Sequence, residues 1–203
     1  MKIICIGRNY VDHIKELHHT VPADPVFFLK PDTALLIRNR PFYYPDFSRL
    51  IHHEVELVMK ISKVGKNIQP AFANSYFDEI AVGLDFTARD LQDKAKQNGL
   101  PWALSKGFDH SAPLSRFVPK TKFLDLSDIS FRLDLNSKTV QTGNSGLMIF
   151  SFDQIISYIS RFMTLRTGDL IFTGTPAGVG PVQLGDQLEA YIEDQKFLSC
   201  TVK

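Results

Sequence analysis

The sequence predicts a β-rich α+β domain with a few short peripheral helices. Two-residue alternation of side chains, the pattern of strands, is clearest in Glu54–Ile61 and Ile80–Thr87. Capping-box patterns, which start helices, occur at Thr87–Asp90 and Ser151–Gln154. No repeat, low-complexity tract or long linker divides the 203 residues, so we expect one domain over residues 1–203.

The first quarter of the chain is predicted to hold short elements joined by turns. In order, these are a strand at Lys2–Ile6, a short helix at Tyr10–Leu17, a loop at His18–Pro25, a strand at Val26–Leu29, and Pro-rich and aromatic-rich turns and short strands at Lys30–Ser48. Val11, Ile14 and Leu17 recur at helical spacing and would face the core. The loop at His18–Pro25 is a candidate hinge for a lid.

The two alternating segments each present two distinct faces. The first segment separates Glu54, Glu56, Val58 and Lys60 from Val55, Leu57, Met59 and Ile61. The second separates the apolar Ile80, Val82, Leu84 and Phe86 from Ala81, Gly83, Asp85 and Thr87. Both segments are therefore predicted to be strands with one face toward the core.

The second half of the chain predicts two helices and a set of strands. The first helix is expected from Thr87 to about Asn98 and is ended by Gly99 and Pro101, and the second is opened by Ser151 and Gln154. A hairpin of Ile129–Asn136 and Val140–Thr142 is expected between them. A turn at Thr167–Asp169 is followed by strands at Leu170–Thr173, Leu188–Ile192 and Phe197–Val202. The second helix would turn its apolar stripe toward the core, namely Ile155, Ile156, Ile159 and Phe162.

Two carboxylates share one face of the first alternating strand. Like charges such as those of Glu54 and Glu56, at about 4 Å and an effective dielectric near 20, repel by about 4 kcal/mol. A divalent cation would reverse that sign, and Asp85 lies beside the small Ala81 and Gly83, where an ion has room. Three carboxylates and water suit a hard cation such as Mg²⁺ or Mn²⁺. The alternative is a solvated strand face with two exposed acids.

Two further pairs have the spacing of neighbours on a helix. His13 and Glu16 lie three residues apart, and a carboxylate beside an imidazole orients it and raises its basicity, which suits a general base. The alternative is a local surface ion pair. Arg89 and Gln92 lie one turn apart, and arginine suits bidentate binding of a substrate carboxylate. The alternative there is an ion pair between Arg89 and Asp93.

A lysine and a glycine-rich stretch complete the candidates. Nothing in the sequence around Lys106 distinguishes it from a surface lysine. The stretch Thr173–Gly180 lacks the Lys-Ser/Thr of a phosphate-binding loop and has no helix after it. It is either a loop whose backbone N–H groups approach an anionic ligand or a tight connection between strands.

Charge and composition argue against several classes of protein. A net charge of +1 gives no basic excess of the kind that nucleic-acid and membrane-surface proteins carry. No apolar run reaches the ~20 residues of a membrane span. Cys5 and Cys200 lie in apolar segments and are expected to be buried free thiols. Neither a signal peptide nor a transit peptide is recognised, so we expect a cytoplasmic protein.

Several motifs follow one another along nearly the whole chain. They are Gly7–Tyr10 with His13 and Glu16, Phe28–Pro31, His53–Leu57, Leu84–Gln92, Leu100–Trp102 with Lys106, Met148–Phe150, and Thr173–Gly180. As an ordered set they resemble the fumarylacetoacetate hydrolase family, and within it the small acylpyruvase and oxaloacetate decarboxylase branch. The resemblance implies the family's β-sandwich roll and assembly as a homodimer.

The resemblance also implies roles for residues of this sequence. Glu54, Glu56 and Asp85 match ligands of Mg²⁺, with Mn²⁺ or Ca²⁺ as alternatives. His13 and Glu16 match a catalytic pair on a lid within residues 1–25. Lys106 matches a lysine near the developing enolate. Substrate-contacting positions are matched by Arg8, Lys30, Arg89, Gln92 and Thr175.

The implied reaction is Mg²⁺-dependent cleavage of a C–C bond in small 2-oxo acids, through a pyruvate enolate held by the cation. Acylpyruvate hydrolysis would use His13 to activate water, oxaloacetate decarboxylation would need no water, and Lys106 would stabilise the charge in both. One alternative is a 2-hydroxyhepta-2,4-diene-1,7-dioate isomerase or 5-oxopent-3-ene-1,2,5-tricarboxylate decarboxylase of aromatic catabolism. Another is a non-catalytic module that binds a 2-oxo acid or a cation. The segments Asp109–Arg116 and Asn144–Gly146 depart from the family's common pattern, which bears on substrate choice.

Overall fold

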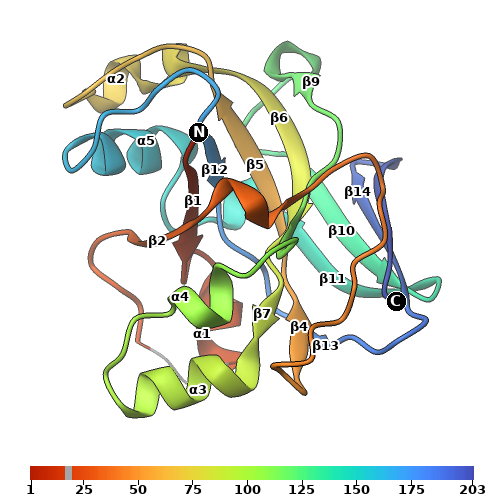
Figure 1. The fold of residues 1–203 in the computed structure, drawn as a ribbon. Helices are drawn as coiled ribbons and strands as arrows, with labels where there is room; N and C mark the ends of the chain where they lie inside the picture. The colour runs from red at the N-terminus through yellow and green to blue at the C-terminus, as the bar shows by residue number, and fades with distance from the viewer. Residues whose placement is uncertain (17–19) are drawn as a thin grey trace.

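The structure, a computed structural model, describes residues 1–16 and 20–203. Two sheets pack against each other around one large apolar core, and short helices lie at the edges and ends (Figure 1). The larger sheet has six strands in the order β2 (Val26–Lys30), β1 (Ile3–Gly7), β12 (Leu170–Phe172), β5 (Val55–Ile61), β6 (Phe77–Leu84) and β9 (Val118–Pro119). The second sheet has four, in the order β11 (Lys138–Asn144), β10 (Ser130–Leu135), β14 (Gln187–Ile192) and β15 (Gln195–Thr201). This confirms the β-rich α+β prediction.

The remaining elements are short. Small sheets are formed by β13 (Gly180–Pro181) with β4 (Ile51–His53) and β7 (Thr87–Ala88), and by β3 (Leu35–Leu36) with β8 (Ala112–Pro113). The helices are α1 (Val11–Glu16), α2 (Pro70–Ala73), α3 (Arg89–Gln97), α4 (Ala103–Lys106) and α5 (Phe152–Ser160), with 3₁₀ turns at Asp32–Ala34, Asn74–Tyr76, Lys120–Lys122 and Ser145–Leu147. Helices α1, α3 and α4 gather at the end of the larger sheet where β1 ends (Figure 1). None of the helices in the described part of the chain is both long and apolar enough to cross a membrane.

Strands β5 and β6 are neighbouring interior strands of the larger sheet and are buried along most of their length. They pair antiparallel from Val55 opposite Leu84 to Ile61 opposite Phe77. The predicted division into two faces is confirmed, because the Leu57 side belongs to the core between the sheets and the Val58 side belongs to a second cluster beyond it. The alternative of a solvated face with two exposed acids is wrong, since Glu54 and Glu56 are only 5% and 1% exposed.

The pairing of β1 with β12 joins segments far apart in the sequence and is the unusual pairing in the larger sheet. Strand β1 runs parallel to β12, with Ile3 opposite Leu170 and Cys5 opposite Phe172, whereas the other pairings in this sheet are antiparallel. The predicted terminal and late strands are found within two residues of their expected bounds. Cys5 and Cys200 are buried free thiols, as expected.

The predicted hairpin and the second capping box are confirmed. Strands β10 and β11 are joined through Asn136 and Ser137, whose φ values of 50° and 66° are those of a tight hairpin turn. The Ser151 hydroxyl accepts from Gln154 N–H at 3.4 Å, and Ser151 N–H donates to Gln154 Oε1 at 2.8 Å. Helix α5 therefore begins where the sequence places it.

We expect Ser151→Ala to lower the free energy of unfolding by about 1 kcal/mol, because the first turn of α5 loses its side-chain cap. In a chain of this size that is a fall in melting temperature of about 2–4 °C, measurable by differential scanning calorimetry. Ser157→Ala in the same helix is the control, since the Ser157 hydroxyl makes no hydrogen bond to the described residues. Equal melting temperatures for Ser151→Ala and the wild type would show that the cap contributes nothing.

Three expectations about the helices are wrong in detail. Thr87 does not cap α3, because Thr87 and Ala88 pair with β4 and the Thr87 hydroxyl donates to Asp85 O at 3.1 Å. Phe162 is 55% exposed, because α5 ends at Ser160 and turns that side chain outward. Val11, which was expected to face the core together with Ile14, is exposed. Of the described residues on that face of α1, only Ile14 is buried. Two further expectations lie partly outside the described residues, namely the end of the predicted helix at Leu17 and the start of the predicted hinge loop at His18 and His19.

Candidate active site

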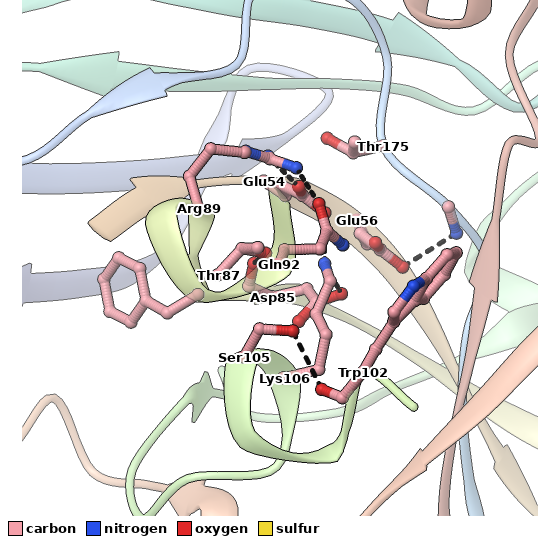
Figure 2. A network of polar contacts seen from close by, with 12 residues as sticks. Glu54, Glu56, Asp85, Thr87, Arg89, Gln92, Trp102, Ser105, Lys106 and Thr175 are labelled. Carbon is pink, nitrogen blue, oxygen red and sulfur yellow. Dashed lines mark hydrogen bonds and ion pairs between the residues drawn. The ribbon is translucent and has the colours of Figure 1, made fainter. Parts of the chain in front are cut away.

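A cavity opens at the end of the larger sheet where β1 ends and β5 begins. Glu54 precedes β5 by one residue, Asp85 follows β6 by one, and α3 and α4 cover them (Figures 1 and 2). All of the predicted site residues except Glu16 and Lys30 line it, namely Arg8, His13, Glu54, Glu56, Asp85, Arg89, Gln92, Lys106 and Thr175. The structure thus brings together side chains from across the sequence.

The three predicted metal ligands meet at the floor of this cavity. One oxygen from each of Glu54, Glu56 and Asp85 lies within 4.8 Å of the other two, and all three residues are buried. Asp85 N–H donates to Glu54 O at 2.8 Å, so the strand ends that carry these two side chains are fixed to each other. Burial, with the nearby charges of Asp85 and Glu54, raises the pKa of Glu56 well above its ordinary value.

The carboxylates are surrounded by three buried cations, namely Lys106, Arg89 and Lys30. Lys106 Nζ lies 2.7 Å from both Glu54 Oε2 and Asp85 Oδ2, and Arg89 lies 2.5 Å from Glu54 Oε1 (Figure 2). Although burial opposes ionisation, Lys106 and Arg89 hold the pKa of Glu54 below its ordinary value. Burial lowers the pKa of Lys106, but Asp85 and Glu54 raise it above its ordinary value overall. Lys106 is therefore an ammonium group beside two carboxylates.

The donor set fits a hard divalent cation. Its members are carboxylates, without sulfur or imidazole, which favours Mg²⁺ or Mn²⁺ over softer metals. Asp85 Oδ1 is buried and accepts no hydrogen bond from the described residues, although Lys30 Nζ lies 2.7 Å away as an ion pair. Glu56 lacks a cationic partner of its own within the described chain and faces two like charges. A cation among the three oxygens would satisfy both groups.

Lys30 has a different position from the predicted one. Its side chain is fully buried beneath Asp85 and does not line the cavity. Its ammonium group donates to Ser111 Oγ at 2.9 Å and to the main-chain oxygens of Phe86, Lys106 and Ser111. In place of a substrate contact, the structure gives Lys30 a supporting role behind Asp85.

His13 and Glu16 form the predicted pair on α1. His13 Nδ1 lies 3.1 Å from Glu16 Oε2, and His13 is 6% exposed within the cavity lining. If the carboxylate accepts from Nδ1–H, then Nε2 carries the free lone pair of the ring. The Glu16 side chain lies behind His13, outside the cavity lining, where it orients the imidazole.

The glycine-rich loop binds the carboxylates of the site through its main chain. Gly174 N–H donates to Glu56 Oε2 at 2.7 Å, and Gly178 N–H donates to Glu16 Oε1 at 3.1 Å. Both glycines have positive φ, 101° and 97°, and a Cβ there would come within 2.7 Å of Asn9 Cβ and 2.2 Å of Val140 O respectively. The anions that this loop approaches are thus carboxylates of the protein itself, Glu56 of the candidate metal triad and Glu16 of α1.

Helix α3 presents one polar face to the cavity. Arg89 donates to Gln92 Oε1 at 2.6 Å, and because arginine only donates, the amide NH₂ of Gln92 is left for the cavity. Lys96 continues this face, seven residues after Arg89, and with Trp102 also lines the cavity. Lys96 was not predicted, although its helical spacing from Arg89 and Gln92 was a usable signal.

Gln141, on β11 of the second sheet, is a site residue that no sequence pattern indicated. It is 1% exposed, and its Oε1 accepts from Val55 N–H at 3.1 Å and lies 2.9 Å from His53 Nδ1. Its Nε2 donates to Thr175 Oγ1 at 2.8 Å and to Pro176 O at 3.0 Å. Gln141 therefore ties the start of β5, which carries Glu56 of the candidate metal triad, to the glycine-rich loop.

We expect Gln141→Leu to lower the free energy of unfolding by about 1–3 kcal/mol, because Val55 N–H would be left buried without a partner. Urea unfolding followed by circular dichroism measures the change. Thr142→Val, at an exposed position next to it on β11, should shift stability by less than about 0.5 kcal/mol. If both variants unfold at the same urea concentration as the wild type, this cross-sheet link is not a stabilising one.

Residues 2–203 match the protein family described as fumarylacetoacetate (FAA) hydrolase C-terminal, which covers every residue of the site. The chain belongs to the fumarylacetoacetate hydrolase family. The resemblance noted in the motifs and the fold that it implied are confirmed.

Relatives within the fumarylacetoacetate hydrolase family extend over nearly the whole chain. A mouse protein named oxaloacetate tautomerase FAHD1, mitochondrial, is 48% identical over 201 residues, covering 99% of this chain and 91% of the relative. Oxaloacetate decarboxylase, mitochondrial, of Dictyostelium discoideum is 44% identical over 192 residues, covering 94% and 88%. The crystal structure of fumarylpyruvate hydrolase from Pseudomonas aeruginosa with Mn²⁺ and pyruvate has a TM-score of 0.95 at 35% identity, covering 100% and 89%. The chain is therefore similar throughout to lyases, tautomerases and hydrolases.

Proposed function

We propose that the protein is a Mg²⁺-dependent enzyme that cleaves a C–C bond in small 2-oxo acids. One observation carries the proposal: the buried triad of Glu54, Glu56 and Asp85 shares a cavity with His13, which has Glu16 behind it. A site for binding a cation or a 2-oxo acid alone would need the triad but not an oriented base. The names of the relatives, and the Mn²⁺ and pyruvate in the structure of one of them, support the same reaction class.

Glu54, Glu56 and Asp85 would hold the cation. When bound, Mg²⁺ supplies Lewis-acid stabilisation of negative charge on the substrate's oxygens. The positive groups of Arg89 and Lys106, with the Gln92 amide and the Thr175 hydroxyl, would orient the carboxylate and 2-oxo oxygens of the substrate.

In acylpyruvate hydrolysis, His13 Nε2 would take a proton from the attacking water while Glu16 stabilises the imidazolium. Water adds to the distal carbonyl, the C–C bond breaks, and the products are a carboxylic acid and the enolate of pyruvate, which then takes a proton. In oxaloacetate decarboxylation the same enolate forms by loss of CO₂, without the water. Lys106 would stabilise the enolate charge in both reactions.

A second candidate is the keto–enol tautomerisation of oxaloacetate. The mouse relative that is 48% identical is named an oxaloacetate tautomerase. The reaction needs only a proton carried between oxygen and carbon, which His13 Nε2 is placed to do. Loss of the enol's ultraviolet absorbance, faster with the protein than without it, would support this activity.

The first test is release of pyruvate from acetylpyruvate and from oxaloacetate, each with Mg²⁺ and with excess EDTA. Metal-dependent pyruvate from either substrate is the expected result. No pyruvate from either, with Mg²⁺ bound as measured by calorimetry, would overturn the proposal and leave tautomerisation, the aromatic-catabolism isomerase or a binding module as the function.

The proposal includes a homodimer in the cytoplasm. A molar mass near twice 23.0 kDa by light scattering is expected for the dimer. The mouse and Dictyostelium relatives carry the word mitochondrial in their names. Fluorescence microscopy of the tagged full-length protein in its own cells distinguishes the two compartments.

A further inference from the structure

Gln141 is fixed at both ends of its side-chain amide by main-chain groups. Val55 N–H can only donate, so the atom that lies 3.1 Å from it is the amide oxygen Oε1. Pro176 O can only accept, so the atom that lies 3.0 Å from it is the amide nitrogen Nε2. Because the two assignments agree, this buried amide has one orientation, with its NH₂ group toward the glycine-rich loop.

The orientation of the amide decides the role of the Thr175 hydroxyl. Gln141 Nε2 lies 2.8 Å from Thr175 Oγ1, and because an amide NH₂ group only donates, the hydroxyl oxygen accepts. The hydroxyl proton must then point elsewhere, and within residues 1–16 and 20–203 no group accepts it. Thr175 is 4% exposed and lines the cavity, and buried donors normally have an acceptor. The hydroxyl is therefore left to donate to a ligand in the cavity.

The main chain is held on both sides of Thr175. Gly174 N–H donates to Glu56 Oε2 at 2.7 Å, and Pro176 O accepts from Gln141. Thr175 cannot shift along the loop without breaking a contact to the triad or to β11. The direction of its hydroxyl is thus controlled by the Gln141 amide and not by movement of the loop.

The other polar groups above the triad are donors as well. Arginine and lysine have no acceptor, and Gln92 uses its oxygen to accept from Arg89 at 2.6 Å, which leaves its NH₂ group. A hydroxyl has one proton and two lone pairs, so Thr175 alone among these groups could act either way. With its lone pairs toward the cavity, Thr175 would repel the oxygens of a 2-oxo acid.

We propose that Gln141 is a positioning residue that holds the Thr175 hydroxyl as a hydrogen-bond donor to the 2-oxo acid. Gln141 does not itself line the cavity and acts through Thr175. This inference rests on the proposed function, since it takes the ligand to be an anion with oxygens beside the triad. It gives Gln141 a part in binding and turnover that is separate from its contact with Val55.

Two substitutions of Gln141 distinguish this role from simple support. Gln141→Glu keeps an oxygen for Val55 N–H but offers an acceptor to Thr175, so the hydroxyl turns away from the cavity. Gln141→Met removes the NH₂ group without a strong acceptor, so the hydroxyl is free to turn either way. At pH 8, where ionisation of the new carboxyl is favoured, kcat/KM for pyruvate release should fall about 10–100-fold in Gln141→Glu and about 2–5-fold in Gln141→Met. A purely supporting role gives the opposite order, because Gln141→Met leaves Val55 N–H unpaired.

Substitutions of Thr175 complete a double-mutant cycle. Thr175→Val should lower kcat/KM about 10–100-fold in the wild type but less than about twofold in Gln141→Glu, where the donor is already lost. Thr175→Ser keeps the hydroxyl and should stay within about threefold of the wild type. The same variants are titrated with oxalate, a dianion whose adjacent oxygens resemble those of the pyruvate enolate, in the Mg²⁺-loaded full chain. Melting temperatures check that each variant is folded.

The matched control is Gln195→Glu, the same change at an exposed position on β15, which should leave kcat/KM within about twofold of the wild type. A loss there as large as in Gln141→Glu would show a general charge effect and overturn the inference. With pyruvate release by the wild type intact, a larger loss in Gln141→Met than in Gln141→Glu, or multiplying losses in the cycle, would overturn the positioning role alone. Absence of pyruvate release by the wild type would overturn the proposed function, and the order of oxalate affinities would then decide the role of Gln141 by itself.

Discussion

Replacing Glu56 with glutamine is expected to reduce Mg²⁺-dependent pyruvate release more than 100-fold, beyond the 10–100-fold typical of residues that only support a ligand. The carboxamide is neutral and a poor ligand for a hard cation, while its oxygen can still accept from Gly174 N–H, so the loop should keep its place. Turnover at saturating substrate and Mg²⁺ affinity by calorimetry measure the change. Both should fall together.

Glu79→Gln is the matched control for that variant. Glu79 lies on β6, the strand that pairs with β5, and it forms a partly exposed ion pair with Lys60. Exposed pairs of this kind contribute about 0–1 kcal/mol, so both activity and stability should stay near the wild type. Near-normal turnover in Glu56→Gln would refute its assignment as a metal ligand.

Replacing His13 with alanine is expected to separate the two cleavage reactions. Acylpyruvate hydrolysis should fall about 10²–10⁴-fold, because the water loses the base that takes its proton. Oxaloacetate decarboxylation uses no water and should change by only a few-fold. The measurement is kcat for acetylpyruvate and for oxaloacetate, with Mg²⁺ binding as a check that the metal site is intact.

A graded variant tests how His13 is oriented. Glu16→Gln keeps an oxygen that can accept from His13 Nδ1 and from Gly178 N–H but loses the negative charge, so hydrolysis should fall less than in His13→Ala. If His13→Ala instead lowers both reactions equally, then His13 acts in substrate binding or in a proton transfer common to both, as in tautomerisation.

Local sequence patterns predicted much of the fold, because many of its helices, strands and turns are determined by residues close together in the sequence. The alternation in β5 and β6, the turn at Asn136 and Ser137, and the cap at Ser151 are all set by neighbours in sequence. Thr87 is the instructive failure. Its capping-box pattern lost to pairing with His52 on β4, a contact between segments far apart in sequence that no local pattern reveals.

The same distinction between local patterns and long-range contacts applies to the residues of the candidate site. Carboxylates two apart on a strand, and a histidine and glutamate three apart on a helix, are visible as spacings. The supporting contacts are not visible as spacings, because they join segments that are distant in the sequence. Gln141 reaches Thr175 from the other sheet, and Lys30 lies behind Asp85, so only the folded chain distinguishes a positioning residue from one that lines the cavity.

The parallel pairing of β1 with β12 has a consequence for the order in which the protein is made. Because Ile3 pairs with Leu170, β1 has no neighbour on that side until a further 160 or so residues have been synthesised, and β2 pairs with β1 at the edge of the sheet. Arg8 and His13 follow directly after β1. We therefore expect a nascent chain to close its sheet and complete its reactive centre in one late step, so incomplete chains carry no active enzyme.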